Sequence, residues 1–447
     1  MAAIITEKFR HSNAVTFQAD FASATDKYFM FLGKSSPWSA NDASGASDSA
    51  VPSPVDDVSS EMYYWDDMLA AKNIGSSDAS LVIPRYNWAA DKAFDRYEHN
   101  ISSTNPTNAN TLTNLYNSEF YFVTSELRVY KVIDNNNGGN MSGTEPTDIT
   151  GSKFLHSASG YILQYLYTIS GTDSQKFLTT DFMPVGTSTV YASNPADGVA
   201  ESLLITAGSG YSNGADYYTP IYGDGTGGIV RIVVSGTSIA SFGLTGGTNT
   251  TITQPGSGYT YGTINLTSRV YNSEANAQTD DGTTGLVADG IGGSGTNGVI
   301  SLNVSPKGNG TNGGHGFNPA KEFGAHYVML NTTFSNTEVV DVTQQNDFRR
   351  VGIIKSPYLL GTTTVASATT YRTTRAIYFD SAPSGTYQID EKITQAATGA
   401  VGKVVEWNAA KNVLYYVQER FGDYGTSTTT GDWQAFTNGG PVLGAVS

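Results

Sequence analysis

The most regular β-strand pattern in the chain is Gly160-Tyr161-Ile162-Leu163-Gln164-Tyr165-Leu166-Tyr167-Thr168-Ile169. This run is almost wholly apolar or aromatic, and such a pattern predicts a strand that is buried on both faces. Residues 28–32 form a second run of the same kind, and residues 120–132 are predicted as a third strand. The sequence therefore predicts a mainly β fold with aromatic-rich sheets.

The composition agrees with a folded, turn-rich β protein. Hydrophobic residues make up 39 % of the 447 residues and aromatic residues 11 %, which is enough to form a buried core. Charged residues make up only 15 %, below the roughly 25 % of typical soluble domains. The 49 glycines are typical of a protein with many tight turns. At roughly 150 residues per domain, the length predicts about two to four domains.

Charge and cysteine content exclude several classes of function. The formal net charge is −15 and no basic cluster is denser than Arg349-Arg350, so no nucleic-acid partner is expected. No apolar run approaches the ~20 residues that span a bilayer, so no membrane partner is expected. Charged residues appear from Glu7 onward, which argues against a signal peptide. Because the chain has no cysteine, we expect no disulfides and assembly in a cytoplasm.

The distribution of glycine and aromatic residues predicts four segments. Residues 1–194 are an N-terminal β domain with short helices, and residues 195–305 are a Gly-rich inserted β module. Residues 306–358 return to the core of the first domain, and residues 359–447 are a C-terminal β extension with a hairpin and a polar arm. The predicted fold class is a mainly β, multi-domain, β-sandwich-like protein with a few short helices and a Gly-rich β insertion.

A weak internal repeat lies in the Gly-rich segment. Residues 205–211 read Ile-Thr-Ala-Gly-Ser-Gly-Tyr, and residues 252–259 read Ile-Thr-Gln-Pro-Gly-Ser-Gly-Tyr. Two copies predict a small duplicated β unit rather than a solenoid, which needs at least about three repeats.

Three further local elements are predicted. One helix covers Asn13–Ala24. Residues 401–407 and 413–418 flank a short connection that fits a hairpin. A second helix covers Ser60–Lys72, because its apolar side chains fall at helical spacing, at Met62, Trp65, Met68 and Leu69.

No pattern of reactive side chains stands out. The histidines have no spacing typical of zinc ligands, and neither a nucleophile elbow nor a phosphate-binding loop is present. Adjacent acidic residues are interpreted as solvated surface, because catalytic carboxylate pairs come from separate elements. We therefore expect no catalytic residues, no cofactor and no enzymatic activity.

The metal candidate is a weak calcium loop. Asp134, Asn136 and Glu145 offer oxygen ligands at EF-hand spacing, with Gly139 at the sharp turn. The fifth position is Gly138, which has no side-chain ligand, and the preceding residues are a predicted strand where an EF-hand needs a helix. A turn after a strand explains the Asn-Gly run equally well. We expect no metal, with calcium kept as the alternative.

Several motifs follow one another in the order of a known family. The chain resembles the baseplate wedge subunit of contractile-tailed, T-even-like bacteriophages, of the gene-product-eight type, in the longer form found in cyanophages. The resemblance covers about residues 1–190 and 306–358. The motifs that carry it are Ile4-Ile5-Thr6-Glu7-Lys8-Phe9-Arg10, Gly33-Lys34-Ser35-Ser36-Pro37-Trp38-Ser39, Ile83-Pro84-Arg85 with Trp88, Val129-Tyr130-Lys131-Val132, Gly160-Tyr161, Phe182-Met183-Pro184-Val185 and Asn346-Asp347-Phe348-Arg349-Arg350.

The resemblance implies a non-enzymatic structural subunit of the virion tail baseplate, assembled in the host cytoplasm. Its implied partners are a second copy, in a homodimer, and the other baseplate wedge proteins. Six wedges would then assemble around the hub and take part in the change that triggers sheath contraction. The alternative is a tail fibre or spike-type host-recognition module that binds surface glycans. Two weak repeats and a globular front half favour the wedge.

Four residues are predicted to lie at an interface or in the core, namely Trp38, Trp65, Arg85 and Trp88. Aromatic, charge-poor surfaces suit desolvated interfaces, although core packing is the favoured interpretation for the tryptophans. Arg85 lies beside Tyr86 and Trp88 in sequence, so it could form a cation–π contact or bind a partner's carboxylate.

Overall fold

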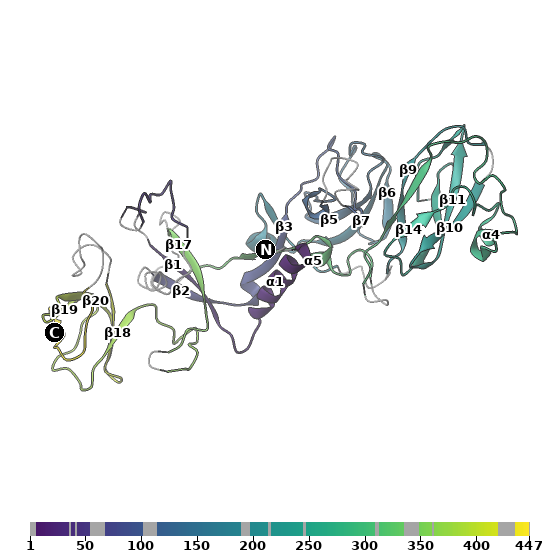
Figure 1. Cartoon of the computed structure of the whole chain (residues 1–447). Helices are drawn as coiled ribbons and strands as arrows, with labels where there is room; N and C mark the ends of the chain where they lie inside the picture. Colours follow the sequence, from purple (N-terminus) through teal and green to yellow (C-terminus); the bar gives the residue numbers. More distant parts are fainter. Residues whose placement is uncertain are drawn as a thin grey trace. The chain divides into compact units, whose positions relative to one another are not determined.

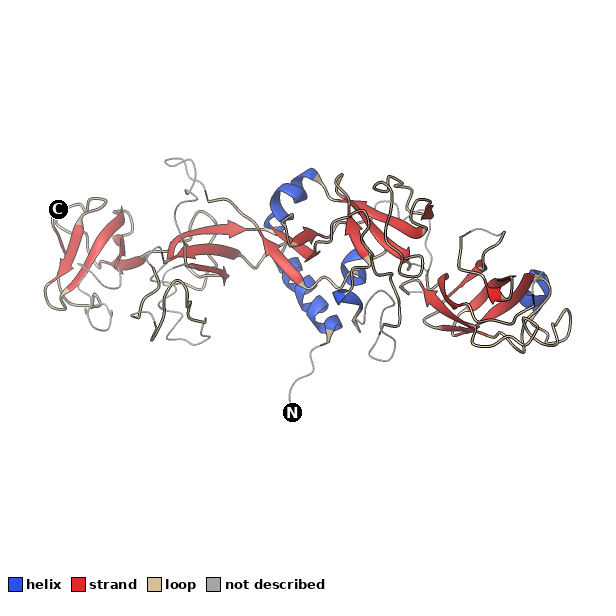
Figure 2. Ribbon diagram, turned by 90° about the horizontal axis from the view of Figure 1, so that it is seen from above, coloured by secondary structure: helices blue, strands red, loops and turns tan. Residues whose placement is uncertain are grey.

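A computed structural model describes residues 6–34, 37–40, 43–53, 68–101, 114–188, 197–212, 216–244, 247–308, 313–334, 348–359, 362–418 and 434–446. The fold is mainly β, with 36 % strand and 10 % helix in several sheets, which confirms the predicted fold class; strands predominate in the ribbon (Figure 2). The chain divides into two compact units, described separately below. Unit 1 is Met1–Phe17 with Ser80–Leu330, and unit 2 is Gln18–Ala79 with Asn331–Ser447.

The first helix is α1 (Glu7–Asp20), which begins and ends earlier than the predicted Asn13–Ala24. Its start is set by Thr6, whose hydroxyl accepts a hydrogen bond from the Phe9 amide at 3.3 Å. Threonine is a favoured N-cap, and Glu7 in the first turn complements the positive end of the helix dipole. The prediction relied on periodicity and missed this capping signal. Ala14 of α1 packs into the core of unit 1.

Unit 1 contains a four-stranded antiparallel sheet in the order β4–β5–β7–β6 (Figure 1). Tyr121 and Val123 of β4 pack into one buried cluster and Phe122 into another, so the two faces of the sheet are both covered. This explains why the predicted strand from Tyr161 is nearly continuously apolar. The strands are β4 (Tyr121–Val123), β5 (Arg128–Asp134), β6 (Lys153–His156) and β7 (Tyr161–Thr168).

The single strand predicted over residues 120–132 is two strands. A tight turn separates β4 from β5, in which the Leu127 amide donates to the Thr124 carbonyl at 3.0 Å. Leu127 has φ +60°, a left-handed conformation that ends a strand. Because both strands are buried, the apolar pattern continues across the turn and conceals it.

The other elements of unit 1 outside the Gly-rich module are short. A three-stranded sheet has the order β16–β3–β8. These strands are β3 (Ala79–Pro84), β8 (Phe182–Pro184) and β16 (Tyr327–Leu330), and the helices are the 3-10 turn η2 (Leu115–Asn117), α3 (Gly171–Phe177) and α5 (Pro319–Glu322).

The Gly-rich module is part of unit 1, and residues near its two ends are hydrogen-bonded to each other. The Ser305 amide donates to the Val199 carbonyl at 2.8 Å, and the Val199 amide donates to the Ser305 hydroxyl at 2.9 Å. Its sheet has the order β12–β11–β10–β14–β15–β9, with β13 also paired to β11. The elements are β9 (Ala200–Thr206), β10 (Asp216–Gly223), β11 (Thr226–Ser235), β12 (Ser238–Ile239), β13 (Thr251–Ser257), β14 (Gly262–Ile264), α4 (Glu274–Thr279) and β15 (Val299–Val304).

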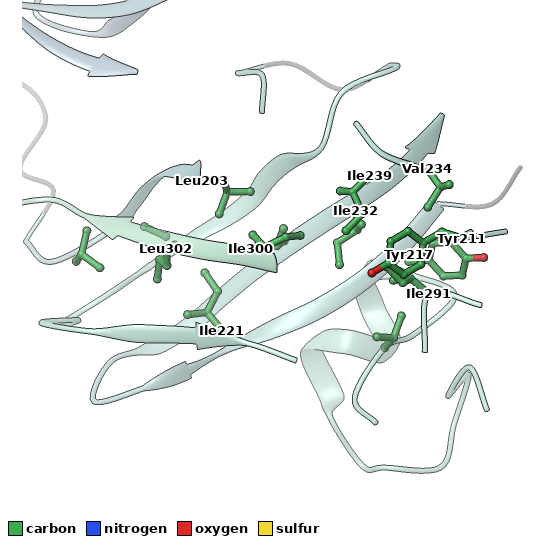
Figure 3. Close-up of a cluster of buried hydrophobic side chains, with 14 of the residues drawn as sticks. Leu203, Tyr211, Tyr217, Ile221, Ile232, Val234, Ile239, Ile291, Ile300 and Leu302 are labelled. Carbon is green, nitrogen blue, oxygen red and sulfur yellow. The ribbon is translucent and has the colours of Figure 1, made fainter. Parts of the chain in front are cut away.

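The module has a hydrophobic core of its own. Side chains from strands distant in sequence, among them Leu203, Ile221, Ile232 and Ile300, gather between the ribbons (Figure 3). Ile232 is fully buried, and Leu203, Ile221 and Ile300 are all buried as well. Burial of this apolar surface stabilises the module, whose many glycines raise the entropic cost of folding.

The two Gly-Ser-Gly-Tyr copies have the same backbone conformation. Gly208 and Gly256 have φ +61° and +62°, and Gly210 and Gly258 have φ +81° and +79°. Such angles are open to glycine at little cost. The tyrosines that follow are both buried. The structure therefore gives the weak repeat a geometric basis.

Each of these tyrosines packs on the partner half of the duplication. The Tyr211 hydroxyl accepts a hydrogen bond from the Gly298 amide at 2.9 Å, and the Tyr259 hydroxyl accepts one from the Gly228 amide at 3.1 Å. The receiving segments are themselves similar, Gly-Asp-Gly-Thr-Gly-Gly at 223–228 and Gly-Ser-Gly-Thr-Asn-Gly at 293–298. The module is thus a duplication in which the two copies exchange their tyrosines, and the Gly-Ser-Gly-Tyr motif is only half of each copy.

Unit 2 contains an antiparallel three-stranded sheet in the order β17–β1–β2, made of β1 (Tyr28–Gly33), β2 (Met68–Ile74) and β17 (Arg350–Lys355). The helix predicted over Ser60–Lys72 is wrong for residues 68–72, while residues 60–67 lie outside the described ranges. Met68 is buried and pairs with Gly33, whereas Leu69 is exposed. Pairing to the buried strand β1 outweighs the helical spacing of a short apolar pattern.

A second sheet of unit 2 has the order β18–β21–β20–β19–β22. The predicted hairpin is confirmed, since β20 pairs antiparallel with β21 on either side of the turn at Lys411. Part of the predicted polar arm, residues 419–433, lies outside the described ranges. The elements of this region are η1 (Ser76–Asp78), β18 (Arg375–Tyr378), β19 (Lys392–Gln395), β20 (Ala400–Asn408), β21 (Val413–Val417) and β22 (Leu443–Gly444).

Candidate functional site

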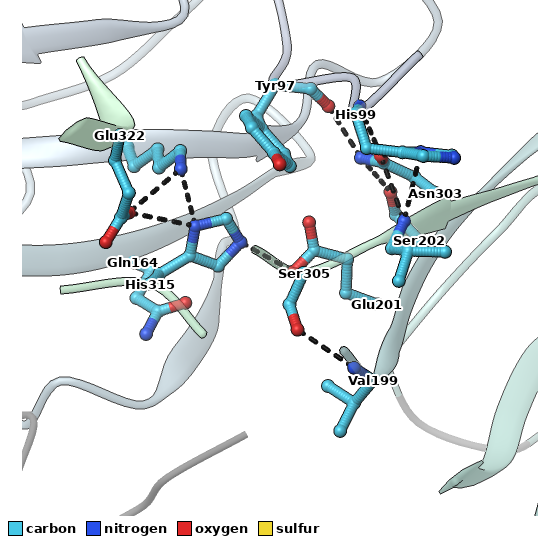
Figure 4. A network of polar contacts seen from close by, with 12 residues as sticks. Tyr97, His99, Gln164, Val199, Glu201, Ser202, Asn303, Ser305, His315 and Glu322 are labelled. Atoms are coloured by element: carbon cyan, nitrogen blue, oxygen red, sulfur yellow. Dashed lines mark hydrogen bonds and ion pairs between the residues drawn. The ribbon is translucent and has the colours of Figure 1, made fainter. Parts of the chain in front are cut away.

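A buried polar cluster in unit 1 joins the Gly-rich module to the central sheet (Figure 4). Lys131 comes from β5, Glu201 from β9 of the module, Asn303 from β15 of the module, and His315 and Glu322 from the segment that follows the module. All five are buried, and Lys131 has no exposed surface. We call these five residues the core–module junction.

The charged half of the junction is a continuous chain of contacts. Lys131 Nζ lies 2.6 Å from His315 Nδ1 and 3.1 Å from Glu322 Oε2. His315 Nε2 lies 2.6 Å from Glu201 Oε2. An ammonium can only donate, so Nδ1 accepts from Lys131 and the ring proton sits on Nε2, from which it is donated to Glu201. His315 thereby connects the lysine of the sheet to the carboxylate of the module.

The electrostatics of this chain are dominated by burial and by the opposing charges. Burial alone would raise the pKa of Glu322, but the adjacent Lys131 ammonium outweighs burial and holds that pKa at about 2. Burial likewise opposes ionisation of Glu201, yet His315, Lys153 and Lys131 keep its pKa below the ordinary value. Burial lowers the pKa of Lys131, against the pull of both carboxylates. The cluster is a paired set of charges in which each group depends on the others.

Aromatic rings complete the surroundings of Lys131. Its Nζ lies 3.8 Å from the centre of the Tyr97 ring and 5.7 Å from that of Phe120. His315 meets the Tyr97 ring edge-on, with ring centres 5.0 Å apart. Desolvated cation–π contacts contribute about 2 kcal/mol or more, so the rings partly replace the water that Lys131 has lost.

The neutral half of the junction is centred on Asn303. Its side-chain nitrogen donates to the Tyr97 carbonyl at 2.6 Å and to the Ser202 hydroxyl at 3.2 Å. Its oxygen accepts from the His99 amide at 3.1 Å. One buried amide therefore bonds both the module and the segment 97–99, and its full set of partners fixes how the two fit together.

The junction is suited to holding segments together. Replacing either Lys131 or Glu201 by an uncharged residue would leave the remaining charges of the cluster buried without full compensation, which costs about 3–5 kcal/mol. Among the described residues, no group of three or more His, Cys, Asp or Glu side chains has the arrangement of a metal site. No helix within the described ranges is long and apolar enough to cross a membrane.

The calcium candidates have separate partners. The Asp134 carboxylate accepts from the Asn136 amide at 2.9 Å, as in an Asx turn, and lies 3.7 Å from Arg96. The Glu145 carboxylate accepts from the amide and the hydroxyl of Ser125, at 3.0 and 2.6 Å. The calcium interpretation of Asp134, Asn136 and Glu145 stays an untested prediction.

The predicted interface-or-core residues lie in different surroundings. In unit 2, Trp38 is half-buried and its ring lies 4.8 Å from Lys34 Nζ and 5.3 Å from the Arg350 guanidinium. Trp65 lies outside the described residues.

In unit 1, Trp88 is half-buried and packs against the cluster of Phe94, Phe122 and Tyr130. Arg85 donates to the Asn87 side chain at 2.8 Å and to the Thr179 carbonyl at 2.7 Å. Among the described residues, the cation recorded over the Tyr86 ring is that of Lys92 rather than that of Arg85.

The family model described as Bacteriophage T4, Gp8 matches residues 3–147 of the chain. This range includes the first three motifs of the resemblance, the Val129–Val132 motif and Lys131 of the junction, but not the motifs from Gly160 onward. The match supports a structural role in the phage tail baseplate wedge. A structural protein of this kind is consistent with the expectation of no enzymatic activity. The comparison with curated proteins found no match.

Proposed function

We propose that this chain is a structural subunit of the baseplate wedge in a contractile phage tail, and that it pairs with a second copy and joins neighbouring wedge proteins. The observation that carries the proposal is the family match over residues 3–147, which includes α1 and β1 to β5. The six-wedge assembly around the hub, the role in sheath contraction, the cyanophage-like form and assembly in the host cytoplasm are part of the same proposal.

The core–module junction supports a scaffolding role. A subunit that contacts several partners needs surfaces in fixed relative positions, and buried paired charges favour one arrangement over alternatives. Only 15 % of the residues of this chain are charged, which keeps the cost of desolvating its own surface at an interface low.

Of the tryptophans predicted at an interface or in the core, Trp38 and Trp88 are described, and they serve different roles in this proposal. Trp38, flanked by two cations at the surface of unit 2, is the candidate for the interface. Trp88 supports the core of unit 1. We expect Trp38→Ala to weaken self-association with little change in thermal stability, and Trp88→Ala to lower stability by about 3 kcal/mol. A Trp88→Ala protein that is soluble, dimeric and as stable as the parent would place this side chain at the free surface.

The test is the mass of the purified protein by light scattering, alone and then mixed with the other wedge proteins of its phage. A dimer that enters a larger complex is the expected result. A stable trimer that ignores those proteins would contradict the proposal and favour the fibre or spike alternative, in which the Gly-rich module binds surface glycans.

A further inference from the structure

Next to the core–module junction, unit 1 has an open hollow of about 360 Å³. Ligand pockets in proteins are about 300–1,000 Å³, so the hollow can take a few side chains of a partner. Its walls are largely aromatic or aliphatic, from Tyr97, Leu115, Tyr116 and Phe317. Phe317 is 41 % exposed, a large apolar side chain open to solvent.

The hollow also contains a polar group without a partner. Tyr97 is only 6 % exposed, yet no hydrogen bond of its hydroxyl to any described residue is recorded. The Tyr97 ring is buried, but its hydroxyl oxygen is open to the hollow that the residue lines. A ligand with an acceptor oxygen can therefore accept a hydrogen bond from this hydroxyl.

The charge at the hollow is positive. Lys321 is exposed, and within the described ranges no partner of its ammonium group is recorded. Lys307 also lines the hollow, where its ammonium donates to the Gly258 carbonyl at 2.6 Å and lies 4.0 Å from Asp224. Glu322 is the acidic residue of the lining, and it is already paired with Lys131. In a chain of net charge −15, a free cation beside an apolar hollow is complementary to an acidic ligand.

We infer that this hollow is a docking site for a protein segment that presents a carboxylate beside an apolar or aromatic side chain. The apolar side chain lies against Tyr116 and Phe317, and the carboxylate accepts hydrogen bonds from Lys321 and from the Tyr97 hydroxyl. The assignment rests on the proposed function for the source of the segment, a neighbouring wedge protein.

The first test uses a defined probe with the full-length protein. Acetyl-Phe-Asp-Phe-amide and its neutral analogue acetyl-Phe-Asn-Phe-amide are titrated by calorimetry up to about 5 mM, a range that covers the weak binding expected of a tripeptide. We expect the acidic peptide to bind and the neutral one to bind about tenfold more weakly, because a charge-assisted hydrogen bond is lost. Absence of binding by the acidic peptide, or equal binding of both peptides, overturns the inference.

Variants locate the binding site. Lys321→Ala removes the free ammonium, and Tyr97→Phe removes the hydroxyl while keeping the ring beside Lys131. Each variant is expected to bind the acidic peptide about tenfold more weakly than the parent protein does. Lys411→Ala, at an exposed turn of unit 2, is the control and is expected to leave binding unchanged. Unchanged binding in both hollow variants overturns the site even if the peptide binds.

Mixing with wedge proteins separates this inference from the proposed function. If the parent protein and Lys321→Glu form the larger complex equally well, the docking site is wrong and the wedge role stands. If the parent forms no complex although the acidic peptide binds in the hollow, the wedge role is wrong and the site stands. Loss of the complex in Lys321→Glu alone supports both.

Discussion

Replacing Glu322 by Gln should destabilise unit 1 strongly, although the two side chains have the same shape. Both oxygens of Glu322 are occupied, since Oε1 accepts from the Gly316 amide at 2.7 Å and Oε2 accepts from Lys131 at 3.1 Å. In glutamine, an NH₂ group would replace one of the two oxygens. Its N–H donors would then face either the Gly316 amide or the Lys131 ammonium, neither of which can accept a hydrogen bond. The substitution would also leave Lys131 buried with Glu201 as its remaining carboxylate.

Two arguments give the same magnitude for the loss of stability in Glu322→Gln. Removing one partner from a buried charge pair costs about 3–5 kcal/mol. The pKa of Glu322 is about 2 in the folded protein, against an ordinary value of 4.5, and by linkage this difference corresponds to on the order of 3 kcal/mol of stability at neutral pH. Because the folded pKa is the lower one, this stability is present above pH 4.5 and is lost as the pH falls toward 2.

The assay is urea unfolding of unit 1, followed by tryptophan fluorescence. Trp88 is the one tryptophan in the sequence of unit 1, so a protein whose other tryptophans are phenylalanine reports on this unit. Glu126→Gln is the matched control, because its side chain is 65 % exposed and pairs with Arg128 at the surface. We expect about 3 kcal/mol loss for Glu322→Gln and less than about 1 kcal/mol for the control.

The pH dependence of stability is a second test of the role of Glu322. The parent protein should lose stability between pH 4.5 and about 2, and Glu322→Gln should lose markedly less over the same interval. A Glu322→Gln protein as stable as the Glu126→Gln control at neutral pH, or one with the parent's full acid sensitivity, would refute the electrostatic account of the junction.

Three further predictions concern the module and its attachment. Tyr211→Phe and Tyr259→Phe should each cost about 1–3 kcal/mol, because each leaves a glycine amide without its partner, half-buried Gly298 and buried Gly228. The Tyr259 hydroxyl also donates to the Ile221 carbonyl, so Tyr259→Phe should lose more. Denaturant unfolding of the two variants checks this, and a larger loss for Tyr211→Phe would contradict it. Gly258→Ala should cost about 1–2 kcal/mol of stability from its positive φ alone. Gly295→Ala should cost more, since its β-carbon would overlap the Tyr211 ring. Equal melting temperatures for these two variants would argue against that packing. Asn303→Ala should lower stability by about 1–3 kcal/mol and speed hydrogen exchange of the backbone amides at the junction. Unchanged exchange of these amides would show that the module is held by other contacts.

Local patterns predicted the strands well and the helices poorly. The strand from Tyr161 was predictable because both of its faces are buried, so every position shows the same apolar preference. The end of β4 at Val123 was hidden for the same reason, and α1 was misplaced because its start depends on the cap at Thr6. Met68 and Leu69 have helical spacing, but pairing with β1 decides their conformation, and that pairing is not encoded locally.

The junction could not be predicted from sequence. Lys131, Glu201 and the segment with His315 and Glu322 are far apart in the chain. Lys131 lies in the Val129–Val132 motif, but that motif indicates the family and not a buried ion pair. A charged residue inside an apolar run, as Lys131 is within β5, is the signal that could have indicated a buried ion pair. The duplication was half predictable, since the Gly-Ser-Gly-Tyr copies were visible while the segments that receive their tyrosines lie at unequal distances from them.

The central claim, that this chain is part of the tail baseplate, is tested most directly on the virion. Antibody raised against the Gly-rich module would be bound to intact particles of the phage that encodes this chain and imaged by electron microscopy. The account predicts label confined to the baseplate, repeated around the tail axis. Label along the fibres or at their tips, with none at the baseplate, would contradict it.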